Sequence, residues 1–216
     1  MLQTSRTTLK RLPQRGSHEI AVIHAILDEG LVCHVGFVHD GQPYVMPTTY
    51  VRLGDHVYLH GAAASRMLTA LADGTRVCVE VTLVDGLVLG RSAMHHSMNY
   101  RSVVLLGTAS DVTDVAEKRR ALEALVEHVV PGRMGEVRPP SANEIAGTRV
   151  VSVPIQEASA KIRTGPPVDA EDDYALPYWA GEVPLKMVPG APVPDPRLAP
   201  GIAAPATVTG YRRRRD

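Results

Sequence analysis

Residues 31–61, LVCHVGFVHDGQPYVMPTTYVRLGDHVYLHG, decide the fold class of this chain. The segment contains three short runs rich in β-branched and aromatic residues, which favour strands. Asp40-Gly41 separates the first two runs, and Gly54-Asp55 separates the second and third. Such pairs supply the backbone angles that tight hairpins require. We therefore predict three consecutive antiparallel strands here.

Further β-type runs follow. Residues 75–84 and 87–92 are expected as two strands joined by a turn at Asp85-Gly86, a long strand begins at Tyr100, and a final strand covers residues 148–156. Consecutive short strands with few helices are typical of an antiparallel barrel or sandwich. A Rossmann fold needs alternating strands and helices and a GxGxxG turn, and the sequence has neither. The usual nicotinamide-binding domain is therefore excluded.

Three helices are expected beside the strands. Residues 17–29 carry a helical apolar stripe, with Ser17 placed to cap the helix and Gly30 to end it. A short helix is expected at residues 64–71. Residues 114–130 are amphipathic, with one apolar face formed by Leu122, Leu125, Val126 and Val129. The predicted domain is mainly β with flanking helices.

Length and charge restrict the class of protein. The 216 residues suffice for one domain with additions and a real core. Lysine plus arginine (23) equals aspartate plus glutamate (23), so the overall charge gives no argument for a nucleic-acid or membrane partner. No stretch approaches the ~20 apolar residues of a membrane span, and the N-terminus lacks the apolar core of a signal peptide. We expect a cytoplasmic protein.

The two cysteines, Cys33 and Cys78, lie in apolar runs and form no CxxC motif. They are interpreted as small core residues in a reducing compartment. A disulfide between them is geometrically open but disfavoured, because disulfides are rare in the cytosol.

The chain divides into an N-terminal arm (residues 1–16), a central domain (17–187) and a proline-rich tail (188–216). The tail ends in a basic run at Arg212–Arg215 and is expected to be loosely held. That run can contact phosphate or an anionic surface, but a solvated tail is the favoured interpretation.

A candidate anion site lies in YLHGAAASRMLTAL, residues 58–71. A strand ends near His60, a turn of small residues follows, and a helix begins near Ser65-Arg66. Amide groups at a helix start and an arginine fork both suit an anion. The simpler alternative is a capped helix with a solvated arginine.

A second candidate is PYVMPTTYV, residues 43–51. Proline cannot donate to a strand ladder, so Pro47 is expected at an edge or a bulge. The backbone near Met46 and Thr48 can then face a ligand. An ordinary edge strand explains the same pattern.

A third candidate is HHSMNYRSVVLLG, residues 95–107, which begins polar and becomes apolar. Strand alternation places Asn99 and Arg101 on one face and Tyr100 and Ser102 on the other. This is the pattern of a strand that enters a barrel from its rim.

Metal and nucleophile chemistry find less support. Adjacent His95 and His96 would point to opposite faces of a strand, and no third ligand lies at a standard spacing, so no metal site is expected. The sequence has no GxSxG motif, and alternation separates Cys33 from His34. No catalytic residue is assigned.

The order GFVHDGQPYVMPTTYV…YLHGAAASR…DGLVLGRSAMHHSMNYRSVVLLG…PGR…KIRTGPP…WAGEVP, within residues 15–187, resembles the pyridoxamine 5′-phosphate oxidase-like flavin-binding proteins, close to the branch of 5-nitroimidazole-resistance proteins. The resemblance implies an antiparallel split β-barrel at residues 17–187 and a homodimer with FMN between the subunits. FMN is preferred over FAD, a deazaflavin or haem because Ser65-Arg66 suit a terminal phosphate.

The resemblance also assigns roles to residues. Ser65 and Arg66 match the phosphate-binding element, in which Met67 replaces the usual lysine, so phosphate affinity leans on Arg66 and Arg101. The other implied flavin contacts are the strand along the ring (Met46, Pro47, Thr48, Thr49), the strand end beside the phosphate (His60, Gly61), the polar strand entry (Asn99, Tyr100, Arg101, Ser102), and a basic pair after the last strand with a tryptophan (Lys161, Arg163, Trp179).

True pyridoxamine phosphate oxidases carry a C-terminal arginine–histidine signature, whereas this chain ends in YRRRRD. Vitamin B6 oxidation is therefore not the expected activity. Two functions remain open: a flavin-dependent oxidoreductase acting on a small molecule, and a non-catalytic flavin-binding module that acts as a carrier, store or sensor. We expect a homodimer with largely aliphatic contacts, in which Lys161, Arg163 and Trp179 reach the partner's flavin.

Overall fold

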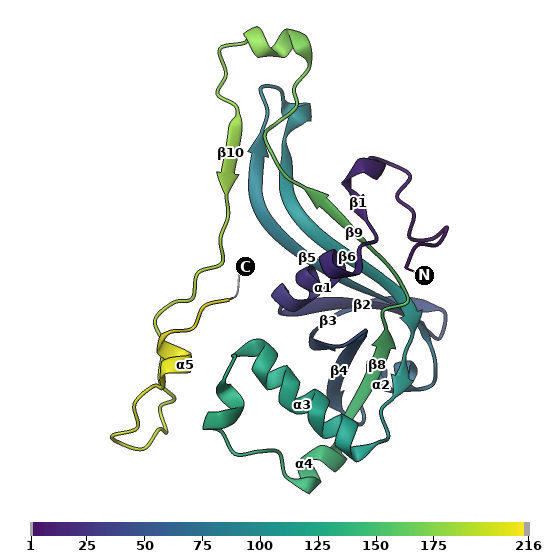
Figure 1. The fold of residues 1–216 in the computed structure, drawn as a ribbon, viewed down its shortest axis with the longest axis vertical. Coiled ribbons are helices and arrows are strands. Elements are labelled where there is room, and N and C mark those ends of the chain that lie inside the picture. The colour runs from purple at the N-terminus through teal and green to yellow at the C-terminus, as the bar shows by residue number, and fades with distance from the viewer. Residues whose placement is uncertain (1, 214–216) are drawn as a thin grey trace.

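The computed structural model describes residues 2–213, and these form a mainly antiparallel β protein with flanking helices (Figure 1). Ten strands form one sheet in the order β1-β9-β6-β5-β2-β3-β4-β8-β7, and β10 adds to β5 outside this path. The sheet is a split barrel that does not close. The strands are β1 (Gly16–Ser17), β2 (Val32–His39), β3 (Gln42–Leu53), β4 (His56–Ala62), β5 (Arg76–Leu89), β6 (Ser97–Thr108), β7 (Ser110–Asp111), β8 (Thr148–Pro154), β9 (Glu157–Arg163) and β10 (Gly181–Pro184).

The predicted run of three strands is confirmed. β2 pairs with β3 from Val32↔Thr49 to His39↔Gln42, and β3 pairs with β4 from Tyr50↔Leu59 to Leu53↔His56. Asp40 and Gly41 have φ of 50° and 74°. Two successive positive φ values are what a twisted two-residue hairpin needs. The turn residues in the sequence therefore fix the register of this part of the sheet.

The predicted turn at Asp85-Gly86 is wrong. β5 runs through this site as one strand, with only a register shift between Val84 and Gly86 opposite β6. The chain stays extended because β5 is paired on both edges, with Leu87 opposite Met98 of β6 and Val183 of β10. The Asp-Gly pair therefore forms a bulge instead of a hairpin.

The sequence predicted residues 148–156 as the final strand, and this is wrong, because β9 and β10 follow β8. Lys161 and Arg163 consequently lie inside β9 and not after the final strand. The β9 sequence EASAKIR carries few branched residues, and pairing with β6 along Leu106↔Glu157 to Tyr100↔Arg163 supplies what local propensity lacks.

The helices are α1 (Ile20–Glu29), α2 (Arg66–Ala72), α3 (Val115–Val129), α4 (Ala142–Gly147) and α5 (Ala206–Thr209). Ser17 does not cap α1, because it belongs to β1 opposite Ala160, and Glu19 takes the N-cap position. Gly30 ends α1 as predicted, and Ser65 caps α2. α4 was not predicted from the sequence, although Ser141 and Glu144 form a capping box at its start.

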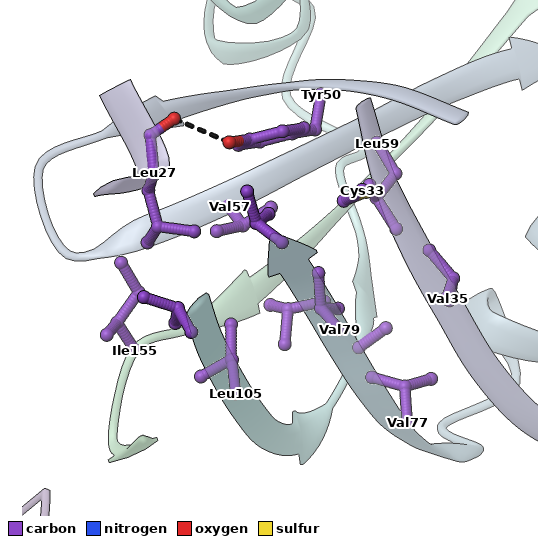
Figure 2. Close-up of a cluster of buried hydrophobic side chains, with 14 of the residues drawn as sticks. Leu27, Cys33, Val35, Tyr50, Val57, Leu59, Val77, Val79, Leu105 and Ile155 are labelled. Carbon is purple, nitrogen blue, oxygen red and sulfur yellow. Dashed lines mark hydrogen bonds between the residues drawn. The ribbon is translucent and has the colours of Figure 1, made fainter. Parts of the chain in front are cut away.

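The barrel interior is aliphatic (Figure 2). Tyr50 is fully buried in it and donates a 2.5 Å hydrogen bond to the Leu27 carbonyl, which ties β3 to α1. Cys33 and Cys78 are free thiols, as predicted. Burial raises the pKa of Cys33 to about 12, so this thiol stays protonated and inert.

An arm projects from the barrel (Figure 1). We define the arm as residues 84–98, at the distal end of the β5–β6 hairpin, together with residues 168–187, which include β10 and the short helical turn Glu171–Ala175. The arm carries many exposed large apolar side chains, among them Met94, Val168, Tyr178, Trp179 and Met187. Within residues 2–213, no helix is long and apolar enough to cross a membrane.

Residues 188–204 of the tail are exposed, whereas Arg213 at the end of the described chain contacts the domain. Arg213 donates to the carbonyls of Asp28, Glu29, Gly30 and His128, so it satisfies groups that the end of α1 leaves open. Arg214 and Arg215, which belong to the predicted basic run, lie outside the described residues, as does Met1 of the N-terminal arm.

Candidate functional site

One edge of β3 is open beside the predicted flavin contacts Met46, Pro47, Thr48 and Thr49. β4 pairs only with Tyr50–Leu53, so on that side residues 42–49 have no strand partner within the described chain. Met46 and Pro47 are exposed, and Thr48 and Thr49 are half-buried. Pro47 therefore lies on an edge, as its missing N–H requires. This edge offers backbone donors and acceptors to a ligand.

The Ser65-Arg66 element lies next to this strand. Ser65 caps α2 by accepting from the Leu68 N–H, and Arg66 is exposed. The Arg66 guanidinium lies 5.7 Å from the centre of the Tyr44 ring on β3, and one of its nitrogens is 3.4 Å from the Tyr44 hydroxyl. No carboxylate of the described residues pairs with Arg66. The charge of Arg66 is thus positioned over β3 and remains available to an anion.

Arg101 is committed elsewhere. Its guanidinium makes paired hydrogen bonds to Glu29 at 2.5 and 2.9 Å and to Asp85 at 2.8 and 2.9 Å. These bonds, to Asp85 and then to Glu29, raise the pKa of Arg101. The cluster joins α1, β5 and β6. Arg101 was expected to bind a cofactor phosphate, but in this chain its guanidinium donates to Asp85 and Glu29 instead.

Asn99 and Arg163 form an internal network as well. Both are buried, and Arg163 donates to the Asn99 side chain and to the carbonyls of Gly165 and Pro166. Asn99 donates in turn to Glu182 of β10. These bonds hold β6, β9 and β10 together, so the two residues stabilise the root of the arm.

The remaining predicted residues lie apart from β3 and α2. Ser102 and Lys161 line a small hollow of about 240 Å³ beside Lys10 and Arg11 of the N-terminal arm. Tyr100 lies opposite Arg163 in the sheet. Trp179 is 68% exposed on the arm. The structure thus brings together the β3 edge and Ser65-Arg66, and it leaves Lys161, Arg163 and Trp179 elsewhere.

His95 has neighbours that sequence spacing did not show. Its Nδ1 lies 3.5 Å from Asp169 Oδ1 and 3.7 Å from Asp173 Oδ2, at the tip of the arm. These three groups are close enough to share an ion. The fully buried Asp169 carboxylate already accepts from the Arg91 guanidinium and from the Arg91 N–H, each at 2.9 Å. The Arg91–Asp169 ion pair thus joins the two segments of the arm, residues 84–98 and 168–187.

His60 and Gly61 end β4 beside a second cavity. His60 lines a hollow of about 310 Å³ between β4 and the segment from α3 to α4. Strand alternation puts Tyr58 and His60 on the face toward α3, whereas Leu59 points into the barrel. The His60 Nδ1 atom is buried and has no hydrogen-bond partner in the described residues. The sequence assigned His60 only to the flank of the phosphate and missed this cavity.

His128 gives the protein an expected pH dependence. Its Nε2 donates to the Gly30 carbonyl at 2.7 Å, and burial lowers its pKa from the ordinary 6.5. Below pH 6.5 the unfolded chain takes up a proton that the folded chain resists, so the free energy of unfolding should fall as the pH falls. Urea unfolding at pH 7.5 and about pH 5.5 measures this. His128→Asn should reduce the difference, and an unchanged difference would contradict the assignment to His128.

The chain is similar over most of its length to proteins of known structure. Residues 19–162 match the family model described as pyridoxamine 5′-phosphate oxidase. The solved structure of the flavocytochrome Anf3 from Azotobacter vinelandii is 42% identical, with 97% of each chain covered and a TM-score of 0.90. The FAD and heme binding protein from Mycobacterium smegmatis is 36% identical, with 91% of this chain and 96% of that chain covered and a TM-score of 0.87.

A more distant structure shares the fold. A 5-nitroimidazole antibiotic resistance protein homologue from Bacteroides thetaiotaomicron is 24% identical, with 68% of this chain and 86% of that chain covered and a TM-score of 0.58. A comparison with curated proteins gives no match. The similarity to the first two structures covers 97% and 91% of this chain, more than residues 19–162 that the family model matches.

Proposed function

Since this chain belongs to the pyridoxamine 5′-phosphate oxidase family, we propose that it is a flavin-binding redox protein with haem as a second cofactor. The observation that carries the proposal is the similarity over 97% of both chains to a protein named a flavocytochrome. A flavin supplies one- and two-electron transfer, and haem supplies one-electron transfer. Residues of this chain bind and orient these groups.

For the flavin, the supporting geometry is the open edge of β3 and the neighbouring Arg66. A flavin ring needs hydrogen-bond partners along one edge, and Met46–Thr49 offer backbone groups there. Its phosphate needs a cation, and Arg66 carries a charge without a carboxylate partner in the described chain. The α2 helix has only seven residues, so the guanidinium and not the helix dipole supplies most of the attraction.

The proposal favours FAD over the FMN expected from the sequence. The relative from Mycobacterium smegmatis is named for FAD and haem, and it covers nearly the whole chain. FAD consists of FMN and AMP joined through a pyrophosphate, so it keeps an anionic phosphate that Arg66 suits and adds a second phosphate and an adenosine. Lys161 and Trp179 lie away from the open edge of β3. They are candidates to contact the flavin of a second subunit.

A homodimer is proposed because the arm exposes several large apolar side chains. Trp179 is 68% exposed and Met94 88% exposed, on a structure that projects from the barrel. Large exposed apolar patches mark interaction surfaces. A two-fold contact would bury the same surface of both chains and give two equivalent flavin sites. The arm of one subunit would then lie against the partner.

The first experiment identifies the cofactors of the purified protein. Released flavin is separated by chromatography, haem is measured from its pyridine complex, and mass is measured by light scattering. FAD and haem bound to a dimer are the expected result. A colourless monomer that no flavin protects against thermal unfolding would refute the proposal. Anaerobic titration with NADH or NADPH then separates a reductase from a carrier, store or sensor, because only the reductase bleaches the flavin rapidly.

Arg66→Ala should weaken flavin binding by about 1.5–3 kcal/mol, since it removes charge-assisted hydrogen bonds to a phosphate. This is roughly ten- to a hundredfold in the dissociation constant. Quenching of flavin fluorescence during titration measures the change. Arg197→Ala is the control, because Arg197 is exposed on the tail. Equal affinities of the two variants would move the phosphate away from Arg66.

A further inference from the structure

We propose that His60 would hold the iron of a haem bound in the cavity between β4 and the α3–α4 segment. This inference rests on the proposed function for the presence of haem, and the structure supplies the place. The neutral imidazole donates a nitrogen lone pair to iron, so one coordinate bond forms and no proton is released. Histidine holds the haem iron in globins and peroxidases.

The cavity has the character that a porphyrin requires. Six apolar residues form most of its lining: Leu122, Leu125, Val126, Met134, Val137 and Pro140. Its volume of about 310 Å³ is at the small end of ligand pockets, so a porphyrin would extend past the opening. The apolar walls would cover the macrocycle, and its edge would face outward.

The opening of the cavity carries charge. Arg138 lies there and is bound to Glu144 through two hydrogen bonds of 2.7 and 2.9 Å. Its side chain is 67% exposed. An exposed guanidinium at the opening can meet a haem propionate, which is an anionic carboxylate. Glu123 and Glu144 line the same hollow, so a propionate would meet Arg138 in competition with its Glu144 partner. The apolar interior is the part of the site that matches the macrocycle.

His60 is a suitable ligand because nothing in the described chain occupies its buried nitrogen. A buried polar atom without a hydrogen bond costs free energy unless a ligand or water satisfies it. Nδ1 has almost no accessible surface, so it faces the protein and not the open hollow. A half-turn of the ring about the Cβ–Cγ bond would move Nδ1 to the opposite side of the ring.

The other histidines have different environments. His128 donates to the Gly30 carbonyl, and His24 lies 3.3 Å from a carboxylate oxygen of Asp55. His95 contacts Ser92 and two aspartates. His56 shares the strand and face of His60 but is exposed. His24 also has a buried nitrogen, Nε2, without a hydrogen bond in the described chain, and it lines a hollow of about 660 Å³. Charged side chains, among them Glu29 and Arg101, line that hollow, whereas the hollow beside His60 is mostly apolar.

The test compares the wild-type protein with His60→Gly and His60→Leu, and with His56→Ala as the matched control on the same strand and face. Each protein is purified with its flavin and titrated with haemin. Absorbance in the Soret region and electron paramagnetic resonance report the ligation and spin state of the iron. Flavin content and circular dichroism report whether the barrel is intact.

Both His60 variants should bind haem at least about tenfold more weakly, or give a changed spin state, because losing even an outer partner of a metal ligand has an effect of this size. Free imidazole should restore the wild-type spectrum of His60→Gly, a rescue that a merely structural role would not show. His60→Leu without haem should unfold at the same or a higher temperature than the wild-type apoprotein, because the unpartnered polar atom is removed.

Wild-type spectra in both His60 variants would overturn the ligand assignment and leave the proposed function standing. A wild-type protein that holds flavin but binds no haem would overturn the assignment together with the haem part of the proposed function. Loss of haem from His56→Ala to the same extent would also overturn the assignment, because that residue is outside the cavity lining.

Discussion

Replacing Arg101 with methionine is expected to destabilise the protein by about 3 kcal/mol. This is the lower end of the range for removing one partner of a buried charge pair, because the side chains of this cluster are only partly buried. Methionine retains most of the apolar stem and removes the charge. The carboxylates of Glu29 and Asp85 would then face each other with side chains only 17% and 24% exposed. Urea unfolding measures the loss.

Two comparisons make the Arg101 result specific. Arg197→Met should change stability by less than about 0.5 kcal/mol, because Arg197 is 93% exposed and exposed ion pairs contribute little. The triple variant Arg101→Met with Glu29→Gln and Asp85→Asn should recover part of the loss, since the unpaired charges are gone. Flavin affinity of folded Arg101→Met should stay close to the wild-type value. A stable Arg101→Met protein with much weaker flavin binding would show that Arg101 contacts the cofactor.

Replacing Gly30 with alanine is expected to cost about 3 kcal/mol, in the upper part of the range for overpacked cores. An added Cβ would lie 2.5 Å from a methyl carbon of Val81 and 2.6 Å from the Tyr50 hydroxyl. That hydroxyl is bound to the Leu27 carbonyl and has no room to retreat without breaking a buried hydrogen bond. Gly30 has φ of −65°, which alanine accepts, so the cost is steric.

Gly147→Ala is the matched control for this effect. Gly147 lies at the end of α4 and an added Cβ would meet no atom within 4 Å. Its stability should change by less than about 0.5 kcal/mol, as for most surface substitutions. Equal urea midpoints for Gly30→Ala and the wild type would mean that the α1–β3 contact adjusts more easily than the packing indicates.

The sequence predicted much of the local structure correctly because local chemistry determines it. Asp40-Gly41 and Gly54-Asp55 form the turns that they indicate, and Ser65 and Gly30 lie at helix ends. The same logic failed at Asp85-Gly86, where two neighbouring strands hold β5 extended. Turn propensity is a local preference, and pairing on both edges of a strand outweighs it.

The candidate site was predictable to a smaller extent. Strand interruption at Pro47 and the Ser65-Arg66 pair are local signals, and the structure brings their neighbourhoods together through Tyr44. Asn99 and Arg163 looked equally polar and accessible in the sequence, yet they are buried against each other. A polar residue in a strand carries no local sign of whether it faces a ligand or another strand.

By itself the sequence determined the alternation of the strands, the positions of most turns and helix ends, and the mainly β class, because these follow from backbone geometry within a few residues. Only the tertiary structure decided which charges are free. Arg101 meets Glu29 across 72 positions of sequence, whereas Arg66 meets no carboxylate of the described chain and the buried nitrogen of His60 meets no partner there. The partners of a polar side chain depend on which distant elements pack beside it, and residue spacing along the chain does not record that.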